Sequence, residues 1–421
     1  MAKRGFAIMK NIDHLEMLKY ITNAQITLET ARLREKAFTR NRKMSFPKAL
    51  SFLMDMRKTT LQTRLNLYFK HTEGGEPISQ QAFSKLRMNF DHTPFEKMVR
   101  EPVEEEYSGK HELPLWNGYH VLAVDGSYLQ LPRIDSLRKE FGVRGGGSLP
   151  SAGISVLYDV LHGWVLDPVI THNDMNERDE CKKHINFLGQ QLPHLVKKSI
   201  LTLDRGYPSR DLFKTLQESG LKFVARCSVK AASEINDAPI GDSSITLKND
   251  VPIRVIKFLS PSGDIKVLAT NLFDLPEEVF PELYSLRWRI ETAYFRLKKE
   301  LSIEKFSGKT PNTIRQDFWA SMALLNVVAT FQKNADEEIR TRQEHKPIKH
   351  VNRARTSDLI ITLRDRFIFA VLCGHPMLTS IEMEDVISTM ARVVSPVRTG
   401  RLFDRSPRPT SNTCQNLKSS L

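Results

Sequence analysis

Residues 121–131 read VLAVDGSYLQL, and this stretch decides the fold class. The run begins with four apolar residues, which an aspartate and a glycine then interrupt. Two further apolar segments follow, GISVLYDVL at 153–161 and WVLDPVIT at 164–171. Short runs of this kind, rich in β-formers and bounded by turn residues, are typical of strands. The sequence therefore predicts that a sheet begins at about residue 120.

Helices and strands alternate after these three strands. The patterns predict a helix at 174–192, a strand at 199–207, a helix at 209–219 and a strand at 221–228. Three strands followed by such an alternation indicate an α/β fold, with a mixed sheet flanked by helices. Residues 229–275 break the rhythm, because they are rich in Ser, Asp and Gly and contain short strand patterns. We expect an inserted β-rich subdomain there.

The chain before the sheet is basic and has helical apolar spacing. We expect residues 1–112 to form an all-α N-terminal domain. Within it, ISQQAFSKLRMNF at 78–90 predicts a helix with Ser79 as its N-cap. Gln and Lys on an exposed helix face can read base edges in a DNA major groove, although an ordinary solvated face is the alternative. The residues of this face are Gln80, Gln81, Ser84 and Lys85.

A long helix is expected at 313–338, where it would complete a central domain at 113–338. Residues 339–421 are expected to form a basic, helical C-terminal region with a disordered tail. The formal net charge of +13 favours a polyanionic partner, and nucleic acid more than a membrane surface. An ordinary basic metabolic enzyme is the alternative.

Membrane insertion and export are not expected. The longest apolar run, at 320–331, is well short of the roughly 20 residues that a membrane span needs. The N-terminal residues lack the apolar stretch of a signal peptide. The four cysteines are far apart and form no CxxC pair, which fits a reduced, cytoplasmic protein and gives no support to a zinc site.

Two aspartates interrupt apolar strands in the predicted sheet. Asp125 follows VLAV and Asp204 follows ILTL, and each is followed by a glycine that we interpret as turn-forming. A carboxylate there is costly to bury unless it is paired or bound to metal. Two such residues on neighbouring strands, with a glutamate from a covering helix, could hold divalent cations. Turn or capping aspartates are the alternative, and we expect Asp159 and Asp167 to be structural.

The glutamate candidate lies in YSLRWRIETAYFRLK, residues 284–298. At about 100° per residue on an α-helix, Tyr284, Arg287, Glu291 and Lys298 share an arc of roughly 60°. This arc borders the apolar stripe of the same helix, so Glu291 is expected at the edge of the buried face. A surface ladder of ion pairs one turn apart is the alternative interpretation.

Together these motifs resemble the IS4 family of DDE transposases. VDGSYLQLP and LDRGYPS resemble the two aspartate motifs of that family, and Tyr284, Arg287, Glu291 and Lys298 match its YREK pattern in residue and in spacing. The matching motifs run in order from about residue 38 to residue 300. The resemblance implies an RNase H-like catalytic core with a β-rich insertion between the second aspartate and the glutamate.

The resemblance also implies roles for single residues. Asp125, Asp204 and Glu291 would be the catalytic residues and the ligands of Mg²⁺, for which Mn²⁺ can substitute. Phosphates of the transposon end would be contacted by Arg287 and Lys298, with a hydrogen bond from Tyr284. Arg205 would contact DNA or, alternatively, help to form its turn. Some relatives stack an aromatic residue of the insertion on a flipped base while making a DNA hairpin. The insertion of this chain has no tryptophan, so Phe258 or Trp288 would take that place.

The implied function is that of a bacterial insertion-sequence transposase. Such an enzyme binds the terminal repeats of its element and target DNA as a homodimer in the cytoplasm, at the nucleoid. It cuts and joins strands by hydrolysis and transesterification, in some relatives through hairpin ends. Two alternatives remain open: a catalytically silent DNA-binding relative, and an RNase H-like nuclease without strand transfer.

Overall fold

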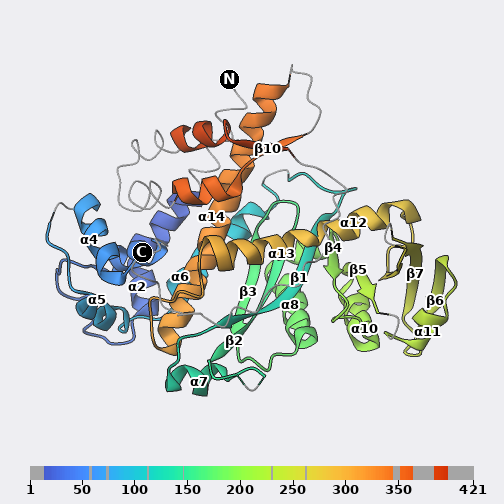
Figure 1. The fold of residues 1–421 in the computed structure, drawn as a ribbon, viewed down its shortest axis with the longest axis horizontal. Helices are drawn as coiled ribbons and strands as arrows, with labels where there is room; N and C mark the ends of the chain where they lie inside the picture. Colours follow the sequence, from blue (N-terminus) through green and yellow to red (C-terminus); the bar gives the residue numbers. More distant parts are fainter. Residues whose placement is uncertain are drawn as a thin grey trace.

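A mixed sheet of eight strands forms the centre of the computed structural model, with helices on both faces (Figure 1). The structure describes residues 14–55, 59–72, 75–110, 113–145, 147–228, 231–260, 263–344, 351–363 and 384–396. The strands in chain order are β1 (His120–Gln130), β2 (Ser151–Asp159), β3 (Val165–Thr171), β4 (Ser199–Leu203), β5 (Lys222–Cys227), β6 (Gly241–Thr246), β7 (Pro252–Leu259) and β8 (Ile265–Thr270). A separate two-stranded sheet pairs β9 (Asn352–Ala354) with β10 (Val394–Pro396).

The named helices precede, cover and follow this sheet. Before the sheet are α2 (Gln25–Ala31), α3 (Phe46–Met54), α4 (Leu61–Thr72), α5 (Gln80–Arg87) and α6 (Thr93–Glu106). Between its strands are α7 (Asp135–Phe141), α8 (Glu177–Gln191), α9 (Pro193–Val196), α10 (Arg210–Ser219) and α11 (Ser233–Asp237). After it come the 3₁₀ turn Glu277–Val279, α12 (Phe280–Leu286), α13 (Trp288–Phe295), a π-helical turn at Arg296–Glu300 and α14 (Pro311–Gln343). None of the helices in the described ranges is both long enough and apolar enough to cross a membrane.

The strand order across the sheet is β3-β2-β1-β4-β5-β8-β7-β6. β1, β2 and β3 form an antiparallel meander, whereas β4 lies parallel to both β1 and β5. The predicted succession of three strands followed by helix, strand, helix and strand is therefore confirmed. The mixed α/β architecture predicted from the sequence is also confirmed.

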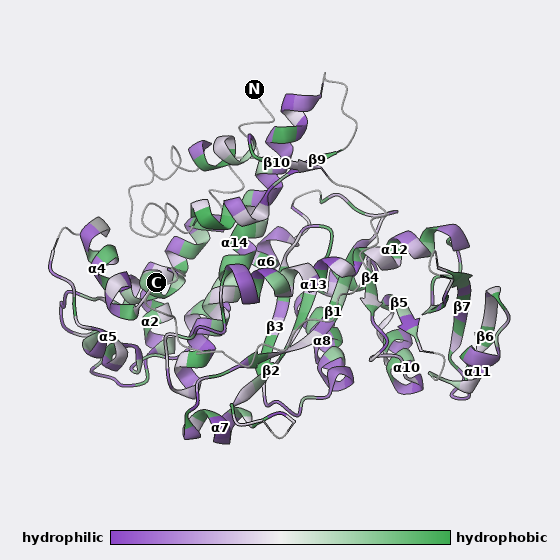
Figure 2. Ribbon diagram, in the orientation of Figure 1, coloured by the Kyte–Doolittle hydropathy of each residue, from purple (hydrophilic) through white to green (hydrophobic). Residues whose placement is uncertain are grey.

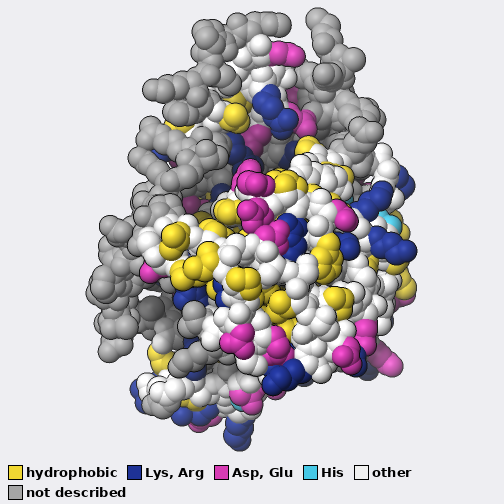
Figure 3. All heavy atoms as spheres, turned by 90° about the vertical axis from the view of Figure 1, so that its right-hand side faces the viewer, with side chains coloured by type: hydrophobic (Ala, Val, Ile, Leu, Met, Phe, Trp, Pro, Cys, Tyr) yellow, Lys and Arg dark blue, Asp and Glu magenta, His cyan; other side chains and the backbone are white. Residues whose placement is uncertain are grey.

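The β-rich insertion expected at 229–275 contains β6, β7 and β8, and these strands belong to the central sheet. Strand β8 pairs antiparallel with β5, with Val224 opposite Thr270, so that β8, β7 and β6 extend the central sheet. Without them, the outer edge of β5 would present unpaired backbone groups, which β8 satisfies. Leu259 at the end of β7 is paired with Ile265 at the start of β8, and these two residues are 66% and 49% exposed. Figure 3 views this side of the molecule, where hydrophobic patches lie among charges of both signs.

The sheet separates two hydrophobic cores, because successive side chains of a strand point to opposite faces. On β1, Val121 and Ala123 belong to the core beneath α13 and α14, whereas Leu122 and Val124 belong to the core beneath α8 and α10. The hydrophobic residues of β1 and β2 lie in the middle of the molecule (Figure 2). This alternation fixes the face to which each polar residue at the end of β1 points.

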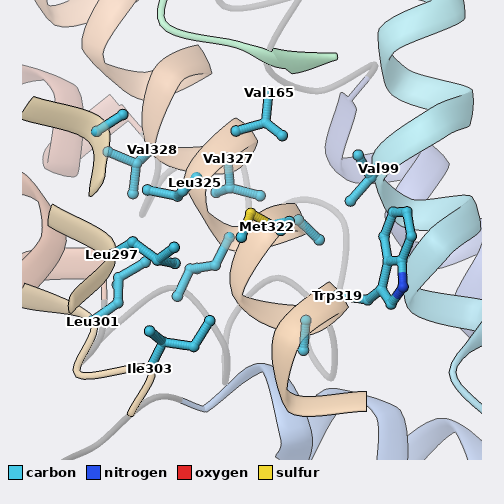
Figure 4. Packing of buried hydrophobic residues seen from close by; sticks show 14 of the residues in the cluster. Val99, Val165, Leu297, Leu301, Ile303, Trp319, Met322, Leu325, Val327 and Val328 are labelled. Carbon is cyan, nitrogen blue, oxygen red and sulfur yellow. The ribbon is translucent and has the colours of Figure 1, made fainter. Parts of the chain in front are cut away.

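The long helix α14 organises the first of these cores. Its 33 residues extend over roughly 50 Å, and the stretch from Ile314 to Phe331 is buried almost throughout. A helix that is apolar on all sides belongs in the interior. Figure 4 shows Trp319 facing Val99 of α6 on one side of α14, while Met322 and Leu325 lie toward the segment that contains Leu297.

The N-terminal helices share this core instead of forming one of their own. Arg87 of α5 is 1% exposed and forms an ion pair of 3.0 Å with Asp317 of α14. It also donates hydrogen bonds to Gln316 Oε1 at 2.9 Å and Ser307 Oγ at 2.8 Å. Ser79 caps α5, as predicted, by accepting a hydrogen bond from the Ala82 amide. The predicted tail at the C-terminus lies outside the described residues.

Candidate active site

Asp125 and Asp204 are neighbours on parallel strands. Ala123 of β1 is paired with Thr202 of β4, and each aspartate follows its paired residue by two positions. Adjacent strands lie about 4.8 Å apart, so the two aspartates stand side by side where β4 ends. Asp125 has the same parity on β1 as Ala123, so its side chain points to the α13 face of the sheet, whereas Asp204 follows the end of β4.

Glu291 reaches the same place from α13. The hydroxyl group of Tyr294, on the same helix, donates a hydrogen bond of 2.6 Å to the backbone oxygen of Asp125, which fixes α13 on β1. Glu291 is near enough to Asp125 to disfavour ionisation of that aspartate. The structure thus brings together the three carboxylates predicted from the sequence.

Electrostatics in this cluster favour a divalent cation. Burial raises the pKa of Asp125 and Arg287 opposes the rise, while the carboxylates of Asp204, Glu291 and Glu177 add to it, so that the pKa is about 7. Like charges gathered in a partly buried site repel one another unless a cation or protons neutralise them. Carboxylate oxygens are the ligands that Mg²⁺ and Mn²⁺ prefer, so the donor set fits such a metal.

The helical segment expected at 284–298 is confirmed, with a turn at Arg287 whose φ and ψ remain right-handed helical. α12 ends at Leu286, α13 begins at Trp288, and the last turn is π-helical. The π-helical turn widens the backbone and redirects Lys298, and such turns are common at functional sites. Lys298 Nζ donates to Ser127 Oγ and to the Tyr128 backbone oxygen, both at 2.8 Å, so this lysine joins the helix to β1.

Arg287 lies at the junction between α12 and α13 and is 8% exposed. Its Nη2 atom donates to Glu291 Oε1 at 2.6 Å, so the ion pair of the alternative interpretation exists. The guanidinium group also lies 5.7 Å from the ring centroid of Tyr284. Arg287 therefore contacts both Tyr284 and Glu291 before any ligand is considered.

Further cations surround the carboxylates. Arg205 is exposed beside Asp204, and Arg226 of β5 lies close to Tyr284, Arg205 and Arg287. Arg144 stacks on the Tyr128 ring, 3.6 Å from its centroid. Sequence reasoning missed Arg226, because its place within an apolar strand gave no signal that it would lie near the site.

The aromatic candidates differ in accessibility. Trp288 is 54% exposed at the start of α13, one residue after the buried Arg287. Phe258 is partly buried and packs against the hydrophobic core. A base could therefore stack on Trp288 without displacing core residues.

The interpretation of Gly126 as turn-forming is wrong. Gly126 lies inside β1, which continues to Gln130, and its φ is not positive. A Cβ atom at Gly126 would lie 2.9 Å from Glu177 Oε1, and one at Gly206 would lie 2.9 Å from Glu177 Oε2. Gly206 does occupy the turn after β4, again without a positive φ. Both glycines make room for Glu177, which sequence reasoning did not assign to the site.

A second group of possible ligands lies at the other end of β1. One ligand atom each of His120, Asp159 and His162 fall within 4.8 Å of one another. Asp159 already accepts hydrogen bonds from Tyr107, from His162 and from two backbone amides. These bonds and the positive His162 hold the pKa of Asp159 at about 2 against the opposing effect of burial. Because its lone pairs are occupied, Asp159 fits the expected structural role better than that of a metal ligand.

The polar face of α5 lies on a groove. Gln80, Gln81, Ser84 and Lys85 are exposed, and they line a cavity of about 740 Å³ together with Lys309 of the segment before α14. A second cleft of about 890 Å³ opens on the other side of Lys85, with Arg34, Lys36, Arg40, Arg42 and Lys43 among its lining residues. α5 is thus a ridge between two grooves rich in basic groups.

Comparison with known proteins assigns the family. The model of the transposase DDE domain matches residues 116–327, which is half of the chain and includes all three carboxylates. The chain belongs to the DDE transposase domain family. The resemblance inferred from the motifs is therefore confirmed. The transposase domain begins four residues before β1 and ends within α14.

Two curated relatives carry transposase names. The chain is 30% identical over 123 residues to the Sinorhizobium fredii protein named "Putative transposase y4zB", covering 27% of this chain and 35% of that protein. It is 24% identical over 239 residues to transposase InsG for insertion sequence element IS4 of Escherichia coli (strain K12), covering 51% of this chain and 52% of InsG. The chain therefore matches about half or less of the length of these relatives.

One solved structure is similar over most of the chain. It is a cryo-EM structure of the piggyBac transposase synaptic complex with hairpin DNA, with 14% identity and a TM-score of 0.48. The match covers 96% of this chain and 88% of that one.

Proposed function

We propose that this chain is the DNA transposase of an insertion sequence, which cuts and joins DNA strands with Mg²⁺ bound by Asp125, Asp204 and Glu291. The observation that carries the proposal is the convergence of these carboxylates from β1, the end of β4 and α13. Arginine and lysine side chains lie close to these carboxylates, and an ordinary acidic patch lacks such neighbouring positive charges. Membership of the DDE transposase domain family supports the same conclusion.

Each residue would have a defined part in the chemistry. Divalent cations held there would activate a water or a 3′-hydroxyl and stabilise the oxygen that leaves the phosphodiester. Arg287 orients Glu291 through their ion pair, and Lys298 anchors the strand that carries Asp125. The exposed Arg205 and Trp288, with Tyr284 and Arg226, would contact the DNA beside the scissile phosphate. Such backbone contacts position a substrate without reading its sequence.

DNA ends would be bound by α5 and the two grooves beside it. Gln80, Gln81 and Ser84 offer hydrogen-bond donors and acceptors to base edges, and Lys85 and Lys309 offer charge to phosphates. A cluster of basic residues in the second cleft extends this positive surface. The formal charge of +13 agrees with a nucleic-acid partner.

We assign the finer architecture in the same proposal. The antiparallel β1, β2 and β3 beside the parallel β4 and β5 support an RNase H-like core within residues 113–338. The N-terminal helices at 1–112 would form the end-binding part, and residues 339–421 the basic C-terminal part. A homodimer would hold two element ends and target DNA in a cut-and-paste reaction, for which hairpin ends are one route.

The direct test uses the full-length protein, Mg²⁺ and a plasmid that carries the mobile element between its own terminal repeats. The proposal predicts nicks at the element boundary and covalent joining of the freed 3′-hydroxyl ends to a second DNA. Products analysed on denaturing gels would also reveal hairpin ends. Nicking without joining would favour the nuclease alternative, and binding without either reaction would favour a silent relative.

A further inference from the structure

Glu177 occupies a position that two glycines leave open. It is the first residue of α8, after the N-cap Asn176, on the face of the sheet opposite α13. One carboxylate oxygen faces Gly126, next to Asp125, and the other faces Gly206, two residues after Asp204. The point where a Cβ of Gly206 would lie is 2.9 Å from Glu177 Oε2 and 3.3 Å from Asp204 Oδ1. Two carboxylates therefore face the same small gap.

Nothing in the described part of the chain explains this placement as a structural contact. Glu177 forms no hydrogen bond or ion pair with any described residue, and it is only partly exposed. Burial raises the pKa of Glu177 and the nearby Asp204 raises it further, while the positive charge of Arg144 opposes them. A helix N-terminus accommodates an acid, but α8 has two other acids in its first turn, Asp179 and Glu180.

We propose that Glu177 is a further carboxylate of the divalent-metal centre, and that positions 126 and 206 are glycines because a side chain there would displace it. Glu177 helps to bind the cation that Asp204 holds, from the α8 side of the sheet. The inference rests on the proposed function, since it assumes a metal at Asp125 and Asp204. It explains why both aspartate motifs contain a glycine although neither glycine has a positive φ.

The test measures Mn²⁺ binding to the full-length protein without DNA. The electron paramagnetic resonance signal of free Mn²⁺ reports how much of the ion remains unbound. Glu177→Gln keeps the shape of the side chain and removes its charge. Asp179→Asn is the matched control, because it removes one charge from the same helical turn at an exposed position. We expect Glu177→Gln to weaken Mn²⁺ binding about tenfold or more, and the control to leave it unchanged.

A second readout separates metal binding from structure. Without metal, Glu177→Gln should keep or raise the thermal midpoint, because it removes repulsion from a partly buried acidic cluster. It should also reduce the rise in midpoint that Mn²⁺ causes in the parent. If Glu177 only stabilised the start of α8, both variants would lower the midpoint without metal and bind Mn²⁺ like the parent, which would overturn the inference.

Asp204→Asn distinguishes failure of the inference from failure of the proposed function. If Asp204→Asn loses Mn²⁺ binding while Glu177→Gln retains it, Glu177 is not part of the centre. If Asp204→Asn binds Mn²⁺ like the parent, the proposed metal site itself is wrong. Loss of binding in both variants supports the inference.

Discussion

Arg287 Nη2 lies 2.6 Å from Glu291 Oε1, across the junction between α12 and α13. The arginine is 8% exposed, so this pair is not the solvated ladder that helical spacing alone suggests. One guanidinium group therefore positions a carboxylate of the proposed centre and faces Tyr284 at the same time. Structural and catalytic roles overlap in this residue, and experiments must separate them.

Arg287→Lys should separate these two roles. It keeps the charge, but it loses the planar fork that can contact Glu291 and a phosphate together. We expect near-parental stability and a fall in cleavage rate of about 100-fold, because small displacements at a reacting centre are costly. Arg287→Ala should also destabilise the fold by about 1–3 kcal/mol. Thermal melting and single-turnover cleavage of both variants test this, and parental cleavage by Arg287→Lys would refute the positioning role.

Gly126→Ala should weaken Mn²⁺ binding in the same way as Glu177→Gln. The new Cβ would meet Glu177 Oε1 at 2.9 Å and Met175 Cε at 3.0 Å, both at the ends of flexible side chains. The protein should therefore fold, and Mn²⁺ affinity should fall as in Glu177→Gln. In a Glu177→Ala background the same glycine substitution should have no further effect. Gly189→Ala is the control, because nothing lies within 4 Å of its added Cβ. An equal loss in both backgrounds would contradict the steric account.

Much of the fold followed from sequence patterns, because each strand and helix carries a local signal. β1 to β5 and α8 and α10 lie close to their predicted ranges, and the three carboxylates met as expected. Proximity across the sheet carries no local signal. Glu177 reaches the site from the opposite face, so its role was visible only once Gly126 and Gly206 had been placed. The widened turn at Lys298 was also missed, since spacing on an ideal helix cannot reveal a π-helical turn.

Substitution of the α5 face should weaken recognition of element ends. Gln80→Ala with Gln81→Ala should reduce the preference for end DNA over random duplex by about 1–3 kcal/mol per lost base contact. Lys85→Ala should instead weaken binding to all duplexes and flatten its salt dependence. Lys214→Ala on α10 is the control. Gel shifts at several salt concentrations measure both effects, and an unchanged preference would place recognition elsewhere.

These measurements need the full-length chain. Arg87 is buried against Asp317 and Gln316 of α14, so a fragment of residues 1–112 would leave its charge without these partners. Breaking a buried pair in this way costs about 3–5 kcal/mol. Failure of such a fragment to bind DNA would therefore say little about recognition.

His14 should make the fold acid-sensitive. Burial lowers its pKa to about 3, and its Nδ1 atom lies 2.8 Å from Thr330 Oγ1. Below pH 6.5 the unfolded chain binds a proton at His14, whereas the folded protein does not until the pH is much lower. The free energy of unfolding therefore decreases as the pH is lowered through that range. From pH 7 to pH 5 the parent should lose about 2 kcal/mol more than His14→Gln. Urea unfolding at both pH values measures this, and parallel losses would contradict it.

The central claim is that Asp125, Asp204 and Glu291 form one metal-dependent centre. Its most direct test is nicking of end DNA by Asp125→Asn, Asp204→Asn and Glu291→Gln, with end binding measured on the same preparations. Each variant should cut more than about 100-fold more slowly than the parent in Mg²⁺, because each loses a metal ligand. End binding should remain, since it rests on basic and amide groups in the N-terminal helices. Near-parental nicking by any one of them would remove that residue from the centre and contradict the account.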